Sequence, residues 1–392
     1  MIDAAALDGL VLPGARIAVA DGCGAPSPAF AALSDLARAR GDLRLLLGWM
    51  PAPPEGLDLA AFTDVRTVMP GWGMRPAVDA GLAHAVPARL ASVPGLVAGP
   101  LRPDLLLARL VAGPGGFLPG SEVSWLRAVV DAGTPVAAVV DDVLPRAAAG
   151  PALPDDQVFV LGRVAVGPAE LPAARPTPEH TAIAGQVARL LTSGCRLQWG
   201  PGQLGSAVVD AVRVPVRADS GLLGDAVVDL DERGLLVGDP VATYLAGSRR
   251  LHAWADARGH AGHPVLHRIE HTHDPVRLLA DPPLIAVNTA VEVDLDGQVN
   301  VEGGAHTVVG GIGGHPDYAA GASRSERGRS VVALASTHRG VPTLVERLSR
   351  PVSTPSHDVD VIVTEHGSAD LRGLDRAERR RALRALWTDV RA

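Results

Sequence analysis

The sequence of 392 residues contains no lysine, so all 36 of its basic side chains are arginine. Without a lysine amine, Schiff-base chemistry is excluded, and so is a P-loop with its phosphate-binding lysine. Any anionic ligand must therefore be held by arginine, by backbone N–H groups or by helix N-termini.

Cysteine, membrane-length apolar runs and excess positive charge are lacking as well. The two cysteines, Cys23 and Cys195, cannot build a disulfide framework or a cysteine-rich zinc site. No uncharged apolar run reaches the ~18–20 residues of a membrane span, and the first residues do not resemble a signal peptide. A net charge of −7 disfavours a nucleic-acid partner. These features predict a cytoplasmic protein without membrane or nucleic-acid partners.

What is present indicates an α/β fold. The chain is 47% hydrophobic, and its length corresponds to two or three domains at roughly 100–200 residues each. Short β-branched runs alternate with Ala- and Leu-rich segments of helical period, a pattern typical of parallel sheets covered on both faces. The runs that we expect to be strands are residues 16–20, 136–140, 158–161, 284–287, 331–335 and 359–363.

A proline-rich stretch at residues 168–178 is the best candidate for a linker. After it, Thr177 and Pro178 predict the start of a helix that ends near Gly194. We therefore predict two domains, residues 1–176 and 177–392. Three pairs of positions share an offset of 180 residues and suggest a duplication: Gly14/Gly194, Arg16/Arg196 and Gly22/Gly202.

The clearest local motif is a G-x-G-x-x-G turn at residues 200–205, between a predicted strand and a predicted helix. Asp219 ends the next predicted strand, 19 residues after Gly200. Alone, this is the dinucleotide fingerprint, with Asp219 placed for a ribose hydroxyl. The glycines and the helix N-terminus would suit the pyrophosphate of any cofactor, and a tight turn without a ligand is the plainer interpretation.

Other candidate sites carry less weight. Four glycines at residues 310–314 predict either a loop that wraps a ligand or a mobile surface hairpin. Five histidines lie between residues 260 and 273, but Pro264 breaks the helix that would align them, so no metal is expected. Cys23 has no histidine or asparagine near it in sequence and is better explained as a small buried thiol than as a nucleophile.

Several longer motifs resemble the acetyl-CoA hydrolase/transferase family, which includes 4-hydroxybutyrate and succinyl-CoA:acetate CoA-transferases. Residues 288–300 are similar to its N-x-A-x-E-V-D-x-x-G-Q-V-N stretch, and residues 311–322 to its G-V-G-G-Q-x-D-F…G-A loop. Residues 353–373 resemble its T-P…D-V-D-x-V-V-T-E-x-G-x-A-x-L-R-G ending, and residues 197–202 its L-Q-x-G-I-G. The resemblance is continuous from about residue 185 to the end.

This resemblance implies two tandem CoA-transferase-like (NagB/RpiA-type) α/β domains that use coenzyme A as substrate and form a homodimer. It implies an acyl-CoA:carboxylate CoA-transferase or an acyl-CoA hydrolase acting on a small acyl-CoA such as acetyl-CoA. The residues it assigns to CoA binding are Gly200, Pro201, Gly202, Gln203, Leu204, Asn288, Gly311, Gly313, Gly314 and Arg329.

The sequence departs from the family at the attacking glutamate, whose usual context is H-x-E-M-x-S-D-G-x-x-D-L. Aligning Gly224 and Asp225 with its S-D places Gly221 at that position. A second alignment, with the E-N-G-x-x-G of the wider group, gives the attacking role to Asp219, which is one methylene shorter. Water activated by Asp219 or by another carboxylate would give hydrolysis instead. The alternatives are an acyl-CoA-binding protein that has lost catalysis and an NAD-dependent oxidoreductase.

Overall fold

Parallel strands organise the chain into two units. The computed structural model describes residues 2–171 and 175–387. Unit 1 comprises Met1–Leu171, Ala242–Glu270 and Val308–Gly311, and unit 2 comprises Pro172–Val241, His271–Thr307 and Ile312–Ala392. The division at residue 171 falls within the proline-rich stretch, five residues before the predicted boundary; residues 172–174 of that stretch lie outside the described residues. The prediction of one boundary assigns Ala242–Glu270 and Val308–Gly311 to the second domain, whereas both segments pack with unit 1.

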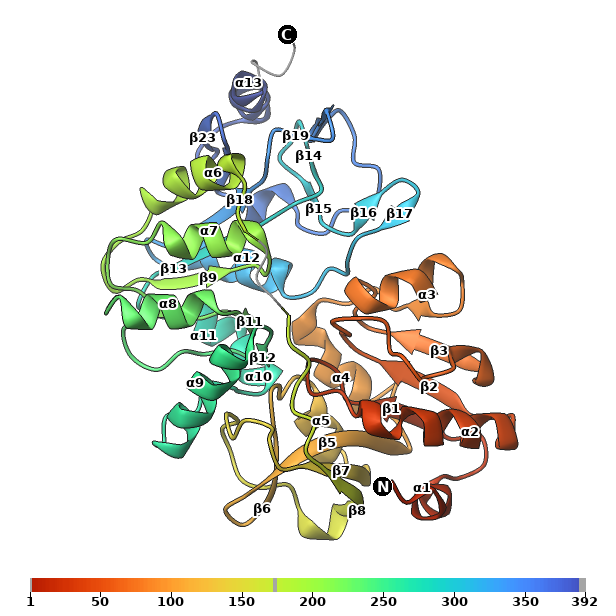
Figure 1. The fold of residues 1–392 in the computed structure, drawn as a ribbon. Coiled ribbons are helices and arrows are strands. Elements are labelled where there is room, and N and C mark those ends of the chain that lie inside the picture. Colours follow the sequence, from red (N-terminus) through yellow and green to blue (C-terminus); the bar gives the residue numbers. More distant parts are fainter. Residues whose placement is uncertain (1, 172–174, 388–392) are drawn as a thin grey trace. The chain divides into compact units, whose positions relative to one another are not determined.

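Unit 1 is built on an eight-stranded sheet of order β4-β3-β2-β1-β5-β7-β8, with β6 antiparallel to β5 and the other neighbours parallel (Figure 1). Every residue of β7 is buried, as expected of a strand covered on both faces. The strands are β1 (Arg16–Val19), β2 (Arg44–Leu47), β3 (Asp64–Thr67), β4 (His84–Ala85), β5 (Leu105–Gly113), β6 (Gly116–Pro119), β7 (Val136–Asp141) and β8 (Val158–Val164). The helices are α1 (Ala4–Leu10), α2 (Phe30–Arg40), α3 (Arg75–Asp79), α4 (Val93–Ala98), α5 (Leu126–Asp131) and α9 (Arg249–His260), and β12 (Tyr244–Leu245) is a further strand.

Unit 2 has a six-stranded sheet of order β10-β9-β13-β18-β22-β23, in which only the last pair is antiparallel. Helices α6 and α7 lie on one side of the β9–β13 pair and α11 on the other (Figure 1), and α12 packs on β13 and β18. The strands of this sheet are β9 (Arg196–Trp199), β10 (Arg217–Ala218), β13 (Leu284–Asn288), β18 (Arg329–Ala333), β22 (Val361–Thr364) and β23 (Gly367–Asp370). The helices are α6 (Pro178–Ala188), α7 (Gln203–Asp210), α8 (Ala226–Glu232), α11 (Pro275–Leu279), α12 (His315–Arg324) and α13 (Arg376–Leu386).

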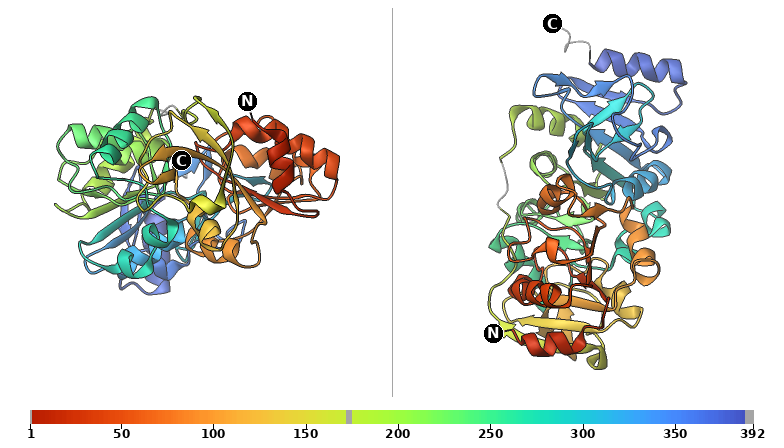
Figure 2. Two further views of the ribbon diagram at one scale, coloured as in Figure 1. Left: turned by 90° about the horizontal axis from the view of Figure 1, so that it is seen from below. Right: turned by 90° about the vertical axis from the view of Figure 1, so that its right-hand side faces the viewer.

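Shorter elements complete unit 2. Strands β14, β15 and β21 form a small three-stranded sheet, and β19 and β20 form a hairpin. Helix α13 packs on β23 near the C-terminal end of the chain (Figure 2). The remaining bounds are β11 (Leu222–Leu223), β14 (Glu292–Asp294), β15 (Val299–Asn300), β16 (Gly303–Gly304), β17 (Thr307–Val308), β19 (Thr337–His338), β20 (Val341–Pro342), β21 (Leu344–Val345) and α10 (Ile269–Thr272); β17 and α10 cross the divisions between the units.

The structure confirms the predicted α/β class with mostly parallel sheets, and each of the six predicted runs overlaps an observed strand. Thr177 caps α6 by accepting from the backbone N–H of His180, as expected, but the helix ends at Ala188 rather than near Gly194. Gly194 adopts a φ of 80° in the turn before β9.

The two large sheets share one topology. The parallel order β2-β1-β5-β7-β8 of unit 1 corresponds to β10-β9-β13-β18-β22 of unit 2. Arg16 and Arg196, which are 180 residues apart, are the first residues of the corresponding strands β1 and β9. Gly22 and Gly202 follow these strands with φ values of 85° and 96°. The strand order therefore supports the duplication that the sequence pattern suggested.

In unit 1, the glycine turn after β1 holds a carboxylate of the same unit. Glu122 accepts hydrogen bonds from the backbone N–H of Gly24 (2.9 Å) and from the hydroxyl of Ser121 (2.8 Å). Burial raises the pKa of Glu122 to about 7, and the nearby carboxylate of Asp21 contributes to the rise. Burial also raises the pKa of the Cys23 thiol far above its usual range, which makes Cys23 a poor nucleophile.

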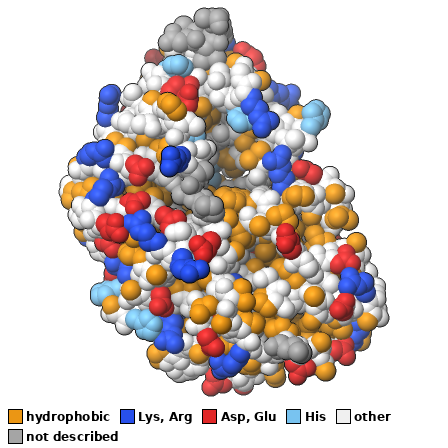
Figure 3. All heavy atoms as spheres, in the orientation of Figure 1, with side chains coloured by type: hydrophobic (Ala, Val, Ile, Leu, Met, Phe, Trp, Pro, Cys, Tyr) orange, Lys and Arg blue, Asp and Glu red, His pale blue; other side chains and the backbone are white. Residues whose placement is uncertain are grey.

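Charged side chains of both signs are interspersed on the face of the molecule drawn in Figure 3. Within residues 2–171 and 175–387, no helix has both the length and the apolar character needed to cross a bilayer.

We expect the stability of unit 1 to fall as the pH rises from about 4.5 to about 7. The pKa of Glu122 is raised in the folded state, so folding favours the protonated acid, and this contribution is lost as the pH passes the folded pKa of about 7. The loss should be on the order of 2–3 kcal/mol. Urea unfolding at pH 5 and pH 8 measures it. Glu122→Gln should reduce the dependence, and the remainder should come from Asp21, whose pKa burial raises to about 6. Glu55→Gln, at an exposed acid of unit 1, should leave the dependence unchanged; equal slopes in both variants would contradict the assignment.

Candidate functional site

The carboxyl ends of four parallel strands in unit 2 carry the polar side chains that could bind a ligand. Residues Gly200–Leu204 follow β9, Asn288 ends β13, Ser336 follows β18, and Glu365 follows β22. Because the strands are parallel and adjacent, their carboxyl ends lie at one edge of the sheet. Ligands of open α/β sheets bind outside this edge.

The glycine turn after β9 is closely built. Gly202 has a φ of 96° and precedes the first residue of α7, Gln203, so its conformation requires glycine. A Cβ atom on Gly205 would collide with the carbonyl oxygen of Gly200. A small pocket at the turn is lined by Gly200, Pro201, Leu204, Gly205, Val208, Val287, Asn288 and Thr289. Six of the residues predicted to bind CoA, the turn residues 200–204 and Asn288, therefore lie together.

Asn288 offers hydrogen-bond donors at this turn. Its side chain is buried, and its Oδ1 accepts from Nε2 of Gln198 at 3.3 Å. This contact fixes the amide plane, and Nδ2 of Asn288 has no hydrogen-bond partner among the described residues. A buried, unpaired amide N–H is costly unless a ligand completes it. The arrangement suits an oxygen that gains negative charge during a reaction.

Glu365 is a carboxylate of the same edge that sequence reasoning did not single out. Its Oε2 accepts from the backbone N–H of Ser336 (2.9 Å), and its Oε1 accepts from the Ser336 hydroxyl (2.6 Å). Nε2 of His366 lies 3.1 Å from the same hydroxyl oxygen. Because Ser336 directs its one hydroxyl proton to Glu365, the contact with His366 requires a proton on Nε2. The position of Glu365 directly after a predicted strand was the signal that could have identified it.

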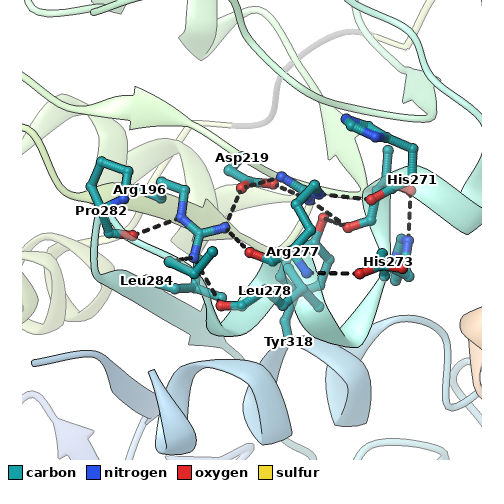
Figure 4. A network of polar contacts seen from close by, with 12 residues as sticks. Arg196, Asp219, His271, His273, Arg277, Leu278, Pro282, Leu284 and Tyr318 are labelled. Carbon is teal, nitrogen blue, oxygen red and sulfur yellow. Dashed lines mark hydrogen bonds and ion pairs between the residues drawn. The ribbon is translucent and has the colours of Figure 1, made fainter. Parts of the chain in front are cut away.

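Asp219, the predicted attacking carboxylate, lies between two arginines (Figure 4). Arg277 binds both of its oxygens, Nη1 to Oδ2 at 2.7 Å and Nη2 to Oδ1 at 2.8 Å. Nη1 of Arg196 lies 3.2 Å from Oδ2. A carboxylate held in this way is a weak nucleophile and has little capacity left for a ribose hydroxyl. The geometry favours a structural role for Asp219.

The two arginines are themselves held by backbone carbonyls. Arg196 donates to the carbonyl oxygens of Leu278 and Pro282, both at 2.8 Å. Arg277 donates to those of His271 and Thr272, both at 2.7 Å (Figure 4). The network therefore ties the start of β9 to the segment around α11.

Gly221, which one of the two alignments places at the position of the family glutamate, faces an imidazole. A Cβ atom added to Gly221 would lie 3.3 Å from Cε1 and 3.4 Å from Nε2 of His273. The His273 ring packs edge-on against Tyr318 with 4.9 Å between ring centres, and a Cβ atom on Gly314 would collide with it. Burial lowers the pKa of His273 to about 3, so the ring is neutral. The imidazole thus fills space that a longer side chain at position 221 would need.

The other predicted CoA ligands are dispersed. Gly313, with a φ of 59°, and Gly314, the N-cap of α12, belong to unit 2, whereas Gly311 belongs to unit 1. Arg329 begins β18 and pairs with Ile285, whereas Asn288 pairs with Val332. Three residues of strand correspond to ~10 Å. The structure therefore places Arg329 at the amino edge of the sheet, opposite the edge that carries Asn288.

Comparison with known proteins identifies relatives. Residues 247–386 match the family described as acetyl-CoA hydrolase/transferase C-terminal domain. Over 213 residues the chain is 31% identical to the succinyl-CoA:cyclohexane-1-carboxylate CoA transferase of Geobacter metallireducens, a match that covers 50% of this chain and 48% of that protein. The chain thus spans about half the length of this relative, as it does of the 4-hydroxybutyrate coenzyme A transferase of Clostridium kluyveri, of which 50% is covered.

Solved structures share the fold. RipA from Yersinia pestis superposes with a TM-score of 0.86 at 22% identity, over 100% of this chain and 96% of RipA. The 4-hydroxybutyrate CoA-transferase from Porphyromonas gingivalis superposes with a TM-score of 0.74 at 19% identity, over 98% of this chain and 93% of that one. The predicted CoA-transferase-like fold is therefore confirmed.

We expect Gly205→Ala to disturb the glycine turn. The new methyl group would meet the carbonyl oxygen of Gly200, and such overpacking costs typically ~1–3 kcal/mol. Gly185→Ala is the matched control, since it lies in α6 with nothing within 4 Å of an added Cβ and should be neutral or stabilising by ~0.5–1 kcal/mol. Chemical denaturation measures both, and equal stabilities would contradict the close contact.

We expect Asp219→Asn to destabilise unit 2 by about 3–5 kcal/mol, because it leaves two largely buried arginines without their carboxylate. Thermal and urea unfolding test this against Glu326→Gln, which changes an exposed acid of the same unit. A variant with unchanged stability but no catalytic activity would instead support Asp219 as the nucleophile.

Proposed function

We propose that this chain, whose residues 247–386 match the acetyl-CoA hydrolase/transferase C-terminal domain, binds a small acyl-CoA such as acetyl-CoA and cleaves its thioester. In a CoA-transferase reaction, the CoA group would be transferred to a carboxylate acceptor. In a hydrolase reaction, water would attack the thioester and free CoA would be released. The observation that carries the proposal is the buried amide of Asn288, whose Nδ2 has no partner among the described residues and lies beside the glycine turn.

The turn and Asn288 suit the chemistry of thioester cleavage. When a nucleophile attacks the thioester carbon, the carbonyl oxygen becomes negatively charged and needs hydrogen-bond donors already in position. The Nδ2 donors of Asn288 are held by the contact of its Oδ1 with Gln198. The backbone N–H groups at the start of α7, after Gly202, add donors and the positive end of a helix dipole.

For the attacking or water-activating carboxylate we favour Glu365 over Asp219. Glu365 follows β22 at the same edge of the sheet as Asn288, and its two oxygens each accept one hydrogen bond from Ser336, which leaves further lone pairs available. Asp219 has both oxygens bound by arginine. Gly221 has no side chain to contribute. If neither acid reacts, the chain binds acyl-CoA without turning it over.

The acyl group, the acceptor, the homodimer and the cytoplasmic location stay predictions. Coenzyme A is the substrate that the family implies, and the residues proposed to contact it are the turn residues Gly200–Leu204 together with Asn288. Gly311, Gly313 and Gly314 stay secondary candidates, since they are divided between the two units.

We expect Asn288→Asp to lower kcat for acetyl-CoA cleavage by roughly 10²–10³-fold, because it removes an oxyanion donor while keeping the shape of the side chain. Binding of CoA, measured by calorimetry, should change far less than kcat. Gln186→Glu makes the same amide-to-acid change at a half-buried position of α6, where Oε1 accepts from Arg189, and as the control it should keep full activity. Unchanged kcat in Asn288→Asp would remove the basis of the proposal.

The two carboxylates can be separated chemically. Incubation with acetyl-CoA, borohydride trapping and peptide mass spectrometry should show CoA or its reduction product on the peptide with Glu365 if the enzyme is a transferase. Glu365→Gln should abolish turnover without the loss of stability expected of Asp219→Asn. An adduct on Asp219 would overturn the assignment. Turnover without any adduct supports hydrolysis, and neither turnover nor adduct over a broad panel of acids supports a binding protein.

A further inference from the structure

A cavity of about 790 Å³ lies at the amino edge of the parallel sheet in unit 2. The turns and loops that precede β9, β13 and β18 border it, together with the start of β10 and the end of α6. Its lining residues are Arg189, Leu190, Thr192, Ser193, Gly194, Arg217, Asp281, Pro282, Pro283, Arg327 and Arg329.

Positive charge dominates this cavity. Four arginines and one acid, Asp281, line it, whereas the whole chain carries a net charge of −7. Arg327 lies 3.6 Å from Asp281, and both of these side chains are largely exposed. Within the described part of the chain, Arg189, Arg217 and Arg329 form no ion pair with a carboxylate. Burial raises the pKa of Asp360, and the charge of Arg329 opposes part of that rise; the pKa of Asp370 is lowered mainly by its hydrogen bond with Arg372 and only slightly by Arg329.

The four guanidinium groups come from three parts of the unit. Arg189 follows α6, Arg217 begins β10, Arg327 precedes β18, and Arg329 begins β18. A single small anion would meet only some of them. Several anionic groups joined in one molecule could meet all four, and the fork of donors on each guanidinium suits phosphate oxygens. Leu190, Pro282 and Pro283 add apolar surface against which the organic part of a ligand could pack.

The cavity is separate from the proposed thioester site. The register of β13 and β18 pairs Ile285 with Arg329 at one end and Asn288 with Val332 at the other. The parallel sheet therefore lies between the arginines of the amino edge and the polar residues of the carboxyl edge. A ligand in the cavity would not compete directly with an acyl group at Asn288.

We propose that this cavity binds an organic polyphosphate, such as a nucleoside diphosphate or triphosphate. The site goes beyond the proposed thioester chemistry and stands whether or not the chain cleaves acyl-CoA. Coenzyme A carries the same chemistry in its pyrophosphate and 3′-phosphate, so the shared feature is a nucleotide with two or more phosphate groups.

Isothermal titration calorimetry of the full chain with ATP, ADP, pyrophosphate and CoA tests the proposal. Arg189→Gln/Arg217→Gln should weaken binding of ATP and ADP by roughly 10-fold or more, since hydrogen bonds to charged groups contribute strongly to affinity. The matched control, Arg347→Gln/Arg381→Gln, removes the same charge from exposed arginines outside the cavity and should bind like the wild type. Circular dichroism spectra verify that both variants are folded.

The remaining outcomes distinguish the source of the phosphates. If the cavity variant weakens ATP and ADP but not CoA, a nucleotide other than CoA occupies the cavity; if it weakens CoA equally, the nucleotide end of CoA does. No binding of any of the four compounds at millimolar concentration would overturn the proposal. So would equal losses in the cavity variant and in the control, because the effect would then come from net charge alone. Arg327→Glu, a charge reversal at an exposed position, should reproduce the loss if the first variant does not fold.

Discussion

The parallel hydrogen bonding of β9, β13, β18 and β22 is the constraint on which the rest of unit 2 depends. Parallel pairing requires each strand to enter at one edge and leave at the other. The chain therefore gathers the residues that follow the strands at the carboxyl edge, where the glycine turn, Asn288 and Glu365 lie. It gathers the residues that precede the strands at the amino edge, where the arginine-lined cavity lies. Neither group is contiguous in sequence.

The ion pairs of Asp219 show how the position of a charge decides its chemistry. Bidentate contact with Arg277 and a third contact from Arg196 satisfy the carboxylate within the protein. Such a group holds elements in place, because breaking it would leave buried charges uncompensated. Beside this carboxylate, Gly221 has no side chain, and the neutral imidazole of His273 occupies the space that a side chain there would need. This part of the unit is arranged for packing, and the candidate chemistry lies at other strand ends.

The two units repeat one strand order but use their first glycine turn differently. In unit 1 the N–H of Gly24 is bound to the carboxylate of Glu122, which belongs to the same unit. In unit 2 the turn at Gly200–Leu204 adjoins a small pocket, and the neighbouring amide of Asn288 keeps donors without a partner among the described residues. A shared backbone motif thus serves packing in one unit and is suited to a ligand in the other. The difference comes from side chains that lie far from the turns in sequence.

Sequence alone determined the α/β class, six strands of the two large sheets, the cap of α6 at Thr177, and the grouping of the glycine turn with Asn288. These follow from local properties, namely apolar periodicity, the conformational freedom of glycine and capping chemistry, and from a resemblance carried by contiguous motifs. Only the tertiary structure decided that Asp219 is neutralised by two arginines, that Glu365 shares an edge with Asn288, and that Arg329 lies at the opposite edge. The pairing of a charge and the edge at which a strand residue lies depend on register and on partners distant in sequence, and neither is encoded in the spacing of residues along the chain.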